Sequence, residues 1–127
     1  MHPLDLDIDK LERVAKQDGR YKKEAFLFVC AALQYTLDQL DARRHISARE
    51  LLNGISQYGR QLYGPMTKSV FEHWGATTTQ DFGEILYLMI DGGVGHITTS
   101  PTDSLHDFKD VYDFEEEFDW RKERRSH

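Results

Sequence analysis

The sequence predicts a mainly α-helical domain of about five helices with a C-terminal hairpin or extended segment. Apolar side chains recur at spacings of three and four between residues 8 and 90, which is the period of amphipathic helices. Capping residues and glycines divide this stretch into separate helices. After Gly93 the apolar spacing changes to two. The 127 residues suit one domain, which we place at residues 1–120, with a basic tail at 121–127.

The first two predicted helices cover residues 5–16 and 21–40. In the first, one face carries Ile8, Leu11, Val14 and Ala15, and Asp18 with Gly19 ends the helix. The second helix carries apolar residues on nearly every face, and such a helix is usually covered by neighbours on most sides. We therefore expect helix 21–40 to be central.

The third predicted helix has the clearest start signal. Ser47 and Glu50 have the spacing of a capping box, in which each side chain accepts a hydrogen bond from the backbone N–H of the other residue. We expect this helix to end near residue 62 and to direct one face inward: Leu51, Leu52, Ile55, Tyr58, Gly59 and Leu62.

Two further helices follow a break at residues 63–65. Pro65 suits the first turn of the fourth helix, which ends at Gly75. The fifth helix begins either with Thr77 capped by Gln80 or with Thr78 capped by Asp81, and it ends at residues 92–93. The residues expected to point inward are Met66, Val70, Phe71 and Trp74 from the fourth helix, and Phe82, Ile85, Leu86, Met89 and Ile90 from the fifth.

The segment after Gly93 favours β structure. Residues 94–99 contain β-branched side chains, residues 100–103 form a turn signal, and apolar residues alternate from Phe108 to Phe114. Two short helices followed by a hairpin resemble a winged helix in element order. The second of those helices contains three acidic residues and no basic one, so we expect no binding to duplex DNA through it.

Seven segments of the chain resemble an uncharacterised family of small bacterial proteins. They are residues 21–26, 44–47, 50–52, 63–66, 73–75, 81–85 and 107–114, and their order and spacing carry the resemblance from about residue 21 to residue 118. The resemblance implies a bacterial source. It supplies no activity, ligand or catalytic residue.

The net charge of −6 is distributed unevenly. Residues 1–63 carry ten basic and nine acidic side chains, whereas residues 64–120 carry two basic and twelve acidic ones. The acidic half is a poor partner for a phosphate backbone.

One cysteine excludes an internal disulfide, and the sequence has neither a membrane-length apolar run nor a signal-peptide pattern. We therefore expect a cytoplasmic protein without membrane contact.

The sequence contains no constellation typical of an enzyme. Cys30 stands in mid-helix among apolar residues, where a thiol is buried rather than nucleophilic. His96, Asp103, His106 and Asp107 lie close in sequence, but their spacing matches no established zinc site. Phosphate-binding loops, dinucleotide fingerprints and nucleophile elbows are missing from the sequence. We expect a non-enzymatic protein without a catalytic residue, cofactor or metal.

Residues 107–120 combine seven acidic with five aromatic side chains. Disordered acidic segments seldom contain so many aromatic residues, so we expect the rings to dock on the helical body. The alternative is that some rings stay exposed as anchors for a basic partner protein. We predict a protein-interaction module with these partner-binding residues: Phe108, Tyr112, Phe114, Glu115, Glu116, Glu117, Phe118, Asp119 and Trp120.

The alternative function is association with RNA or the ribosome through the basic N-terminal half. The candidate contacts are Lys22, Lys23, Arg43, Arg44 and Arg49, which we expect to form a cluster near the start of the third helix. A basic cluster of this size is also common on ordinary solvated surfaces.

Overall fold

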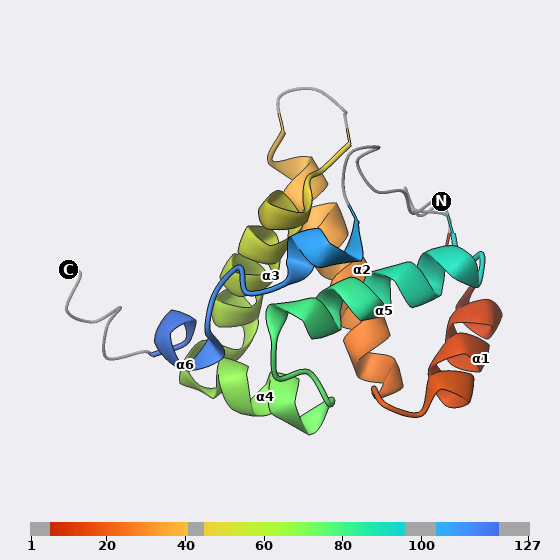
Figure 1. Cartoon of the computed structure of the whole chain (residues 1–127), viewed down its shortest axis with the longest axis horizontal. Helices are drawn as coiled ribbons and strands as arrows, with labels where there is room; N and C mark the ends of the chain where they lie inside the picture. Colours follow the sequence, from red (N-terminus) through yellow and green to blue (C-terminus); the bar gives the residue numbers. More distant parts are fainter. Residues whose placement is uncertain (1–5, 41–44, 96–103, 120–127) are drawn as a thin grey trace.

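The computed structural model describes residues 6–40, 45–95 and 104–119, and these residues form a helical domain without β-strands (Figure 1). This confirms the predicted fold class. The longer helices are α1 (Ile8–Asp18), α2 (Lys23–Asp38), α3 (Ala48–Tyr63), α4 (Thr67–His73) and α5 (Thr79–Asp91). A short 3-10 turn, η1 (Gly64–Met66), joins α3 to α4, and the C-terminal segment contains η2 (Leu105–Phe108) and the single-turn helix α6 (Phe114–Glu117).

Helix α1 begins and ends at residues with clear capping geometry. The Asp7 side chain accepts a hydrogen bond from the Lys10 N–H, and Gly19 adopts the left-handed conformation (φ 75°) that closes the last turn. The prediction therefore placed the end correctly and the start too early. Of its apolar residues, Leu11 and Ala15 are buried, Val14 is half-buried, and Ile8 in the first turn is 46% exposed.

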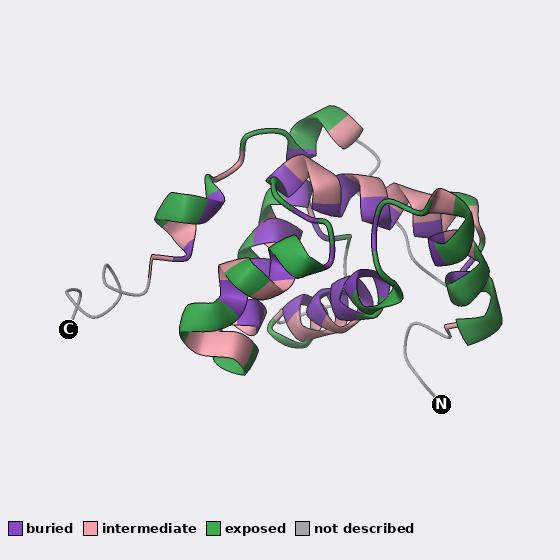
Figure 2. Ribbon diagram, turned by 90° about the horizontal axis from the view of Figure 1, so that it is seen from below, coloured by how far each residue is buried: buried purple, intermediate pink, exposed green. Residues whose placement is uncertain are grey.

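Helix α2 occupies the centre of the domain, as its apolar pattern predicted. It contains eight buried residues and contacts α1, α3 and α5. Helices α2 and α3 run antiparallel, since Tyr35 lies against Tyr58 while Phe28 lies against Tyr63 (Figure 1). Figure 2 shows the buried side of each helix turned toward this shared core.

Helix α3 begins with the predicted capping box. The Ser47 side chain accepts from the Glu50 N–H at 3.1 Å, and the Glu50 carboxylate accepts from the Ser47 N–H at 2.9 Å. The inward prediction fails at the other end of the helix, where Leu62 is 52% exposed, and Met66 in η1 is 57% exposed. Gly64 (φ 53°) turns the chain there, so the apolar stripe of α3 does not continue into α4.

Helix α5 starts in the second of the two predicted registers. Thr78 is the N-cap, and its side chain and that of Asp81 form a capping box. The helix buries Phe82, Ile85 and Met89 and ends at Gly92, close to the predicted stop.

The predicted hairpin is absent from the described part of the C-terminal segment, so the resemblance to a winged helix is not supported. Residues 105–108 and 114–117 are helical, and residues 96–103 lie outside the described residues. The buried Thr79 hydroxyl donates to the Phe108 carbonyl and accepts from the Val111 N–H at 3.2 Å. A side chain of α5 thus satisfies backbone groups that a hairpin would pair with a second strand.

Candidate interaction surfaces

Three phenylalanines of the C-terminal segment complete the aromatic core. Phe108, Phe114 and Phe118 are 1%, 4% and 7% exposed. The rings of Phe114 and Phe118 lie 5.9 and 5.4 Å from that of Phe71, which is itself fully buried. The prediction that these rings dock on the body is confirmed, and the alternative of exposed phenylalanine anchors is wrong.

The other two aromatic residues of the segment differ. Tyr112 is half-buried, and its hydroxyl donates to the Leu52 carbonyl at 2.8 Å. Burial, with a smaller effect from the nearby Glu117 carboxylate, raises the Tyr112 pKa well above its ordinary value. Trp120 lies outside the described residues. Tyr112 therefore fixes the segment to α3 rather than presenting a free ring.

Two acidic side chains of α6 are bound by groups from α3 and α4. The Ser56 hydroxyl donates to the Glu117 carboxylate, and the Arg60 guanidinium lies 4.0 Å from that carboxylate. The Lys68 ammonium lies 3.6 Å from Glu115, whose side chain is 84% exposed. Glu117 is therefore a docking residue, whereas Glu115 remains available at the surface.

The other two acidic residues that were predicted to contact a partner, Glu116 and Asp119, differ in their exposure to solvent. Glu116 is exposed and Asp119 is half-buried. The structure thus turns only part of the acidic run toward solvent.

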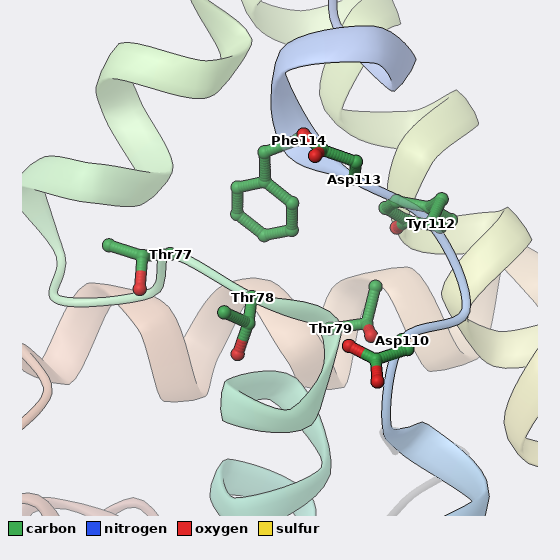
Figure 3. Close-up of a pocket in the computed structure, with 7 residues that line it drawn as sticks. All are labelled: Thr77, Thr78, Thr79, Asp110, Tyr112, Asp113 and Phe114. Carbon is green, nitrogen blue, oxygen red and sulfur yellow. The ribbon is translucent and has the colours of Figure 1, made fainter.

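A pocket of about 270 Å³ lies between the start of α5 and the C-terminal segment (Figure 3). Thr77, Thr78 and Thr79 form one side, and residues 110 and 112–114 form the other. No Lys or Arg side chain lines this pocket. Its charge is therefore set by two aspartates, Asp110 and Asp113.

Asp110 and Asp113 have different roles at the pocket. Asp113 is the N-cap of α6 and accepts from the Glu115 N–H at 2.7 Å. Asp110 is exposed and adopts a left-handed backbone conformation (φ 54°), which is uncommon for a residue other than glycine. Its carboxylate lies toward Thr78 and Thr79 in Figure 3, and it makes no hydrogen bond or ion pair with any described residue. Sequence patterns gave no signal for this residue, because its conformation depends on how the segment docks.

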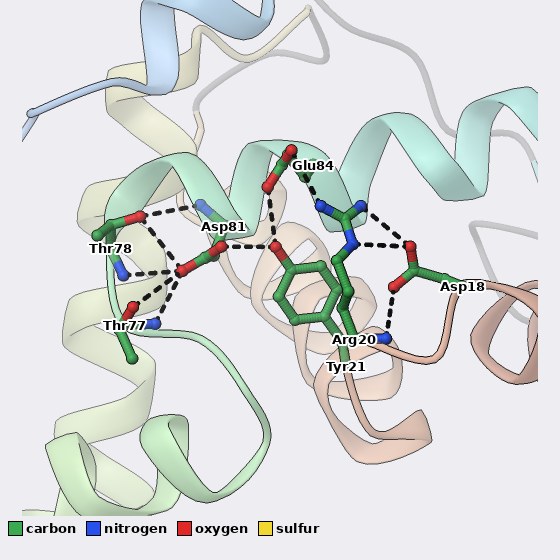
Figure 4. Close-up of polar contacts among 7 residues, drawn as sticks. All are labelled: Asp18, Arg20, Tyr21, Thr77, Thr78, Asp81 and Glu84. Atoms are coloured by element: carbon green, nitrogen blue, oxygen red, sulfur yellow. Dashed lines mark hydrogen bonds and ion pairs between the residues drawn. The ribbon is translucent and has the colours of Figure 1, made fainter.

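A polar network joins the α1–α2 turn to the first turn of α5 (Figure 4). The Tyr21 hydroxyl lies 2.6 Å from an Asp81 oxygen and 2.9 Å from a Glu84 oxygen. The Arg20 guanidinium bridges Glu84 at 3.2 Å and Asp18 at 3.0 Å. Two of the acidic residues of α5 are therefore engaged within the domain.

The network shifts two ionisation equilibria in opposite directions. Burial alone raises the Asp81 pKa, but hydrogen bonds from Tyr21, Thr77 and Thr78 outweigh it and hold that pKa below its usual value. Burial, aided by hydrogen bonds to the two carboxylates, raises the Tyr21 pKa far above its ordinary value. Tyr21 is thus a neutral donor that stabilises an ionised Asp81, and the network stabilises the fold.

The predicted basic cluster does not assemble among the described residues. Lys22 and Lys23 stand at the start of α2, and Lys23 lies 3.8 Å from Glu12. Arg49 stands at the start of α3, which is at the opposite end of the antiparallel pair. Since α2 has 16 residues, about 24 Å separates the two ends. Arg43 and Arg44 lie outside the described residues.

Cys30 is buried at 2% exposure with its sulfur 3.5 Å from that of Met89. Burial raises the pKa of the thiol to about 12, so Cys30 is protonated at neutral pH.

Within the described ranges, no group of three or more His, Cys, Asp or Glu side chains is arranged to hold a metal ion. Of the four residues considered as ligands, His96 and Asp103 lie outside those ranges.

Helices α2 and α3 each carry a row of uncharged side chains, and the two rows meet on the outer side of the pair. On α2, Leu27, Ala31 and Tyr35 follow one another at intervals of one helical turn, and on α3 Tyr58 and Leu62 do the same. The Tyr35 and Tyr58 rings meet at 5.1 Å, which joins the two rows. We call these five residues the α2–α3 face.

No family model matches the chain, and no similar curated protein or solved structure was found. In the part of the chain that is described, no helix has both the length and the hydropathy needed to span a bilayer.

Proposed function

We propose that this chain is a non-enzymatic protein-interaction module that binds a basic segment of a partner protein at its acidic C-terminal surface. The observation that carries the proposal is the unpaired Asp110 carboxylate at a pocket with no basic lining residue. A lysine or arginine side chain from a partner is the complement of such a pocket. Asp113 lines the same pocket, and Glu115, which is 84% exposed although Lys68 lies 3.6 Å away, follows it at the start of α6.

Burial of Phe108, Phe114 and Phe118 supports the proposal because it makes the acidic surface part of the folded body. An ordered surface binds without the entropic cost of ordering a tail. Partner binding then depends on the three rings through the fold, while the contacts themselves come from carboxylates. The proposed location, the cytoplasm, rests on the single cysteine, which leaves the chain without an internal disulfide.

The proposal is tested by capture from an extract of the source organism, after nuclease treatment, on immobilised chain. The test variant is Asp110→Asn/Asp113→Asn/Glu115→Gln, in which asparagine at 113 retains the cap of α6. We expect a basic protein that binds the wild type at low salt, with about tenfold less recovered on the variant. Surface plasmon resonance on that protein should assign most of the loss to a slower association rate, with a difference that shrinks as salt rises.

The matched control removes the same number of negative charges from exposed positions elsewhere: Asp9→Asn, Glu12→Gln and Asp91→Asn. We expect this control to capture the partner as the wild type does. Equal loss of the partner on both variants would mean that only net charge matters. A partner that is captured from an untreated extract and not from the nuclease-treated one would favour RNA. Either result contradicts the proposed surface.

A further inference from the structure

The α2–α3 face is an exposed apolar surface in an unusually uncharged part of the chain. Leu27 and Leu62 are 37% and 52% exposed, and Met66 lies exposed just beyond the end of α3. Three of the four large apolar side chains that are exposed in the described residues therefore lie on this helix pair or at its end. A gathering of this kind marks an interaction site more often than scattered exposed apolar residues do.

The sequence that forms this face carries few charges, so charge there favours neither an acidic nor a basic partner. Residues 25–37 of α2, 51–59 of α3 and 61–67 contain no charged side chain, although 30% of the whole chain is charged. The intervening Arg60 points away from the face, since its guanidinium lies near Ser56 and Glu117 on the other side of α3. The rim of the face consists of the neutral amides of Gln57 and Gln61, which interact with the Tyr35 hydroxyl at 3.3 and 3.0 Å.

These features suit one occupant, a second copy of the same face. Two copies of a chain with a net charge of −6 repel one another, so they approach most easily where neither presents a charge. Glutamine and tyrosine side chains both donate and accept hydrogen bonds, so such a rim can pair with itself. An antiparallel helix pair packed on its own copy about a two-fold axis gives the geometry of a four-helix bundle.

We propose that the chain forms a symmetric homodimer through the α2–α3 face. The face and its rim supply far fewer than the about 20–30 residues per side of a standard stable interface, so the dimer is weak, with a dissociation constant of about 10–1000 µM. This surface lies on different elements from the acidic pocket. The dimer therefore does not depend on the proposed function.

Sedimentation velocity of the whole chain from about 5 µM to 1 mM tests the inference. We expect the average mass to rise with concentration from 14.8 kDa toward twice that value, and the rise to persist at high salt. Leu62→Glu should raise the dissociation constant at least tenfold, since it places two like charges in the contact. Ile8→Glu is the matched control, because Ile8 is 46% exposed on α1, and it should leave dimerisation unchanged.

Chemical-shift changes of the wild type on dilution provide a second measurement that needs no variant. We expect them at residues of the α2–α3 face and not at Asp110 or Asp113. A monomer throughout the concentration range overturns the inference, as does a dimer that Leu62→Glu leaves intact or one with shift changes elsewhere. The variant Asp110→Asn/Asp113→Asn/Glu115→Gln should still dimerise, so failure of the acidic surface and failure of the dimer are separate results.

Discussion

Replacing Phe114 by alanine removes the ring that anchors α6. That ring is 4% exposed and lies 5.9 Å from the Phe82 ring and 5.2 Å from the Phe118 ring. Large-to-small changes of buried phenylalanine cost about 3–5 kcal/mol. Because α6 is one turn at the surface and can partly close over the cavity, we expect the lower end, about 3 kcal/mol.

The corresponding change in melting temperature follows from chain length. At about 2.1 cal/mol/K per residue, a chain of 127 residues loses about 4 °C for each kcal/mol. Phe114→Ala should therefore melt about 10 °C lower in scanning calorimetry and unfold at lower urea concentration. Limited proteolysis should also cut residues 109–118 faster than in the wild type.

Glu115→Ala is the neighbouring control. Its side chain is 84% exposed and its ion pair with Lys68 is superficial, so we expect a change below about 1 kcal/mol. If Phe114→Ala costs less than about 1 kcal/mol, or if the control costs as much, α6 does not pack on the body as described. The account of an ordered acidic surface would then be wrong.

Three further outcomes follow from buried contacts. Folding lowers the Asp81 pKa, so the ionised carboxylate stabilises the fold above the unfolded pKa near 4, and this stabilisation is lost as pH falls. In urea unfolding, Asp81→Asn should therefore cost about 1–3 kcal/mol at pH 7 and progressively less below pH 4. Cys30 should react with a thiol reagent at pH 8 only as fast as the protein opens, and rapid labelling without denaturant would show an accessible thiol. Gly54→Ala should cost about 1–3 kcal/mol, because the new methyl group would overlap the Thr36 hydroxyl. Adding Thr36→Ala should recover part of that stability. Equal stabilities of the single and double variants would contradict the close contact between α2 and α3.

Features fixed by neighbouring residues were predictable from the sequence. The capping box of Ser47 and Glu50 needs only a spacing of three, and the left-handed Gly19 needs only the end of an apolar stripe. The central place of α2 followed from apolar residues on nearly all its faces. Such signals depend on contacts within a few residues, which a single sequence contains.

Features that depend on distant contacts were not predictable in this way. The alternation from Phe108 to Phe114 indicated a strand. Instead, Thr79 binds that backbone, and the Phe114 ring packs on Phe71 of α4 and Phe82 of α5. Leu62 fits an inward stripe on a helical wheel, yet it lies where the helix pair ends and is left uncovered. The Tyr21 hydroxyl, some 60 residues away in sequence, binds Asp81 and so supports the capping box that Asp81 forms with Thr78.

The position of Phe118 against Phe71 has a consequence for synthesis of the chain on the ribosome. The two rings are 5.4 Å apart in space but 47 residues apart in sequence, so the core around Phe71 stays uncovered until the segment with Phe114 and Phe118 has left the exit tunnel. A nascent chain that ends at residue 95 contains the sequence of all five longer helices but lacks the Phe114 and Phe118 rings that pack on Phe71. Such an intermediate exposes the kind of apolar surface that chaperones bind, and this core closes only after residues 114–118 have been made and released from the tunnel.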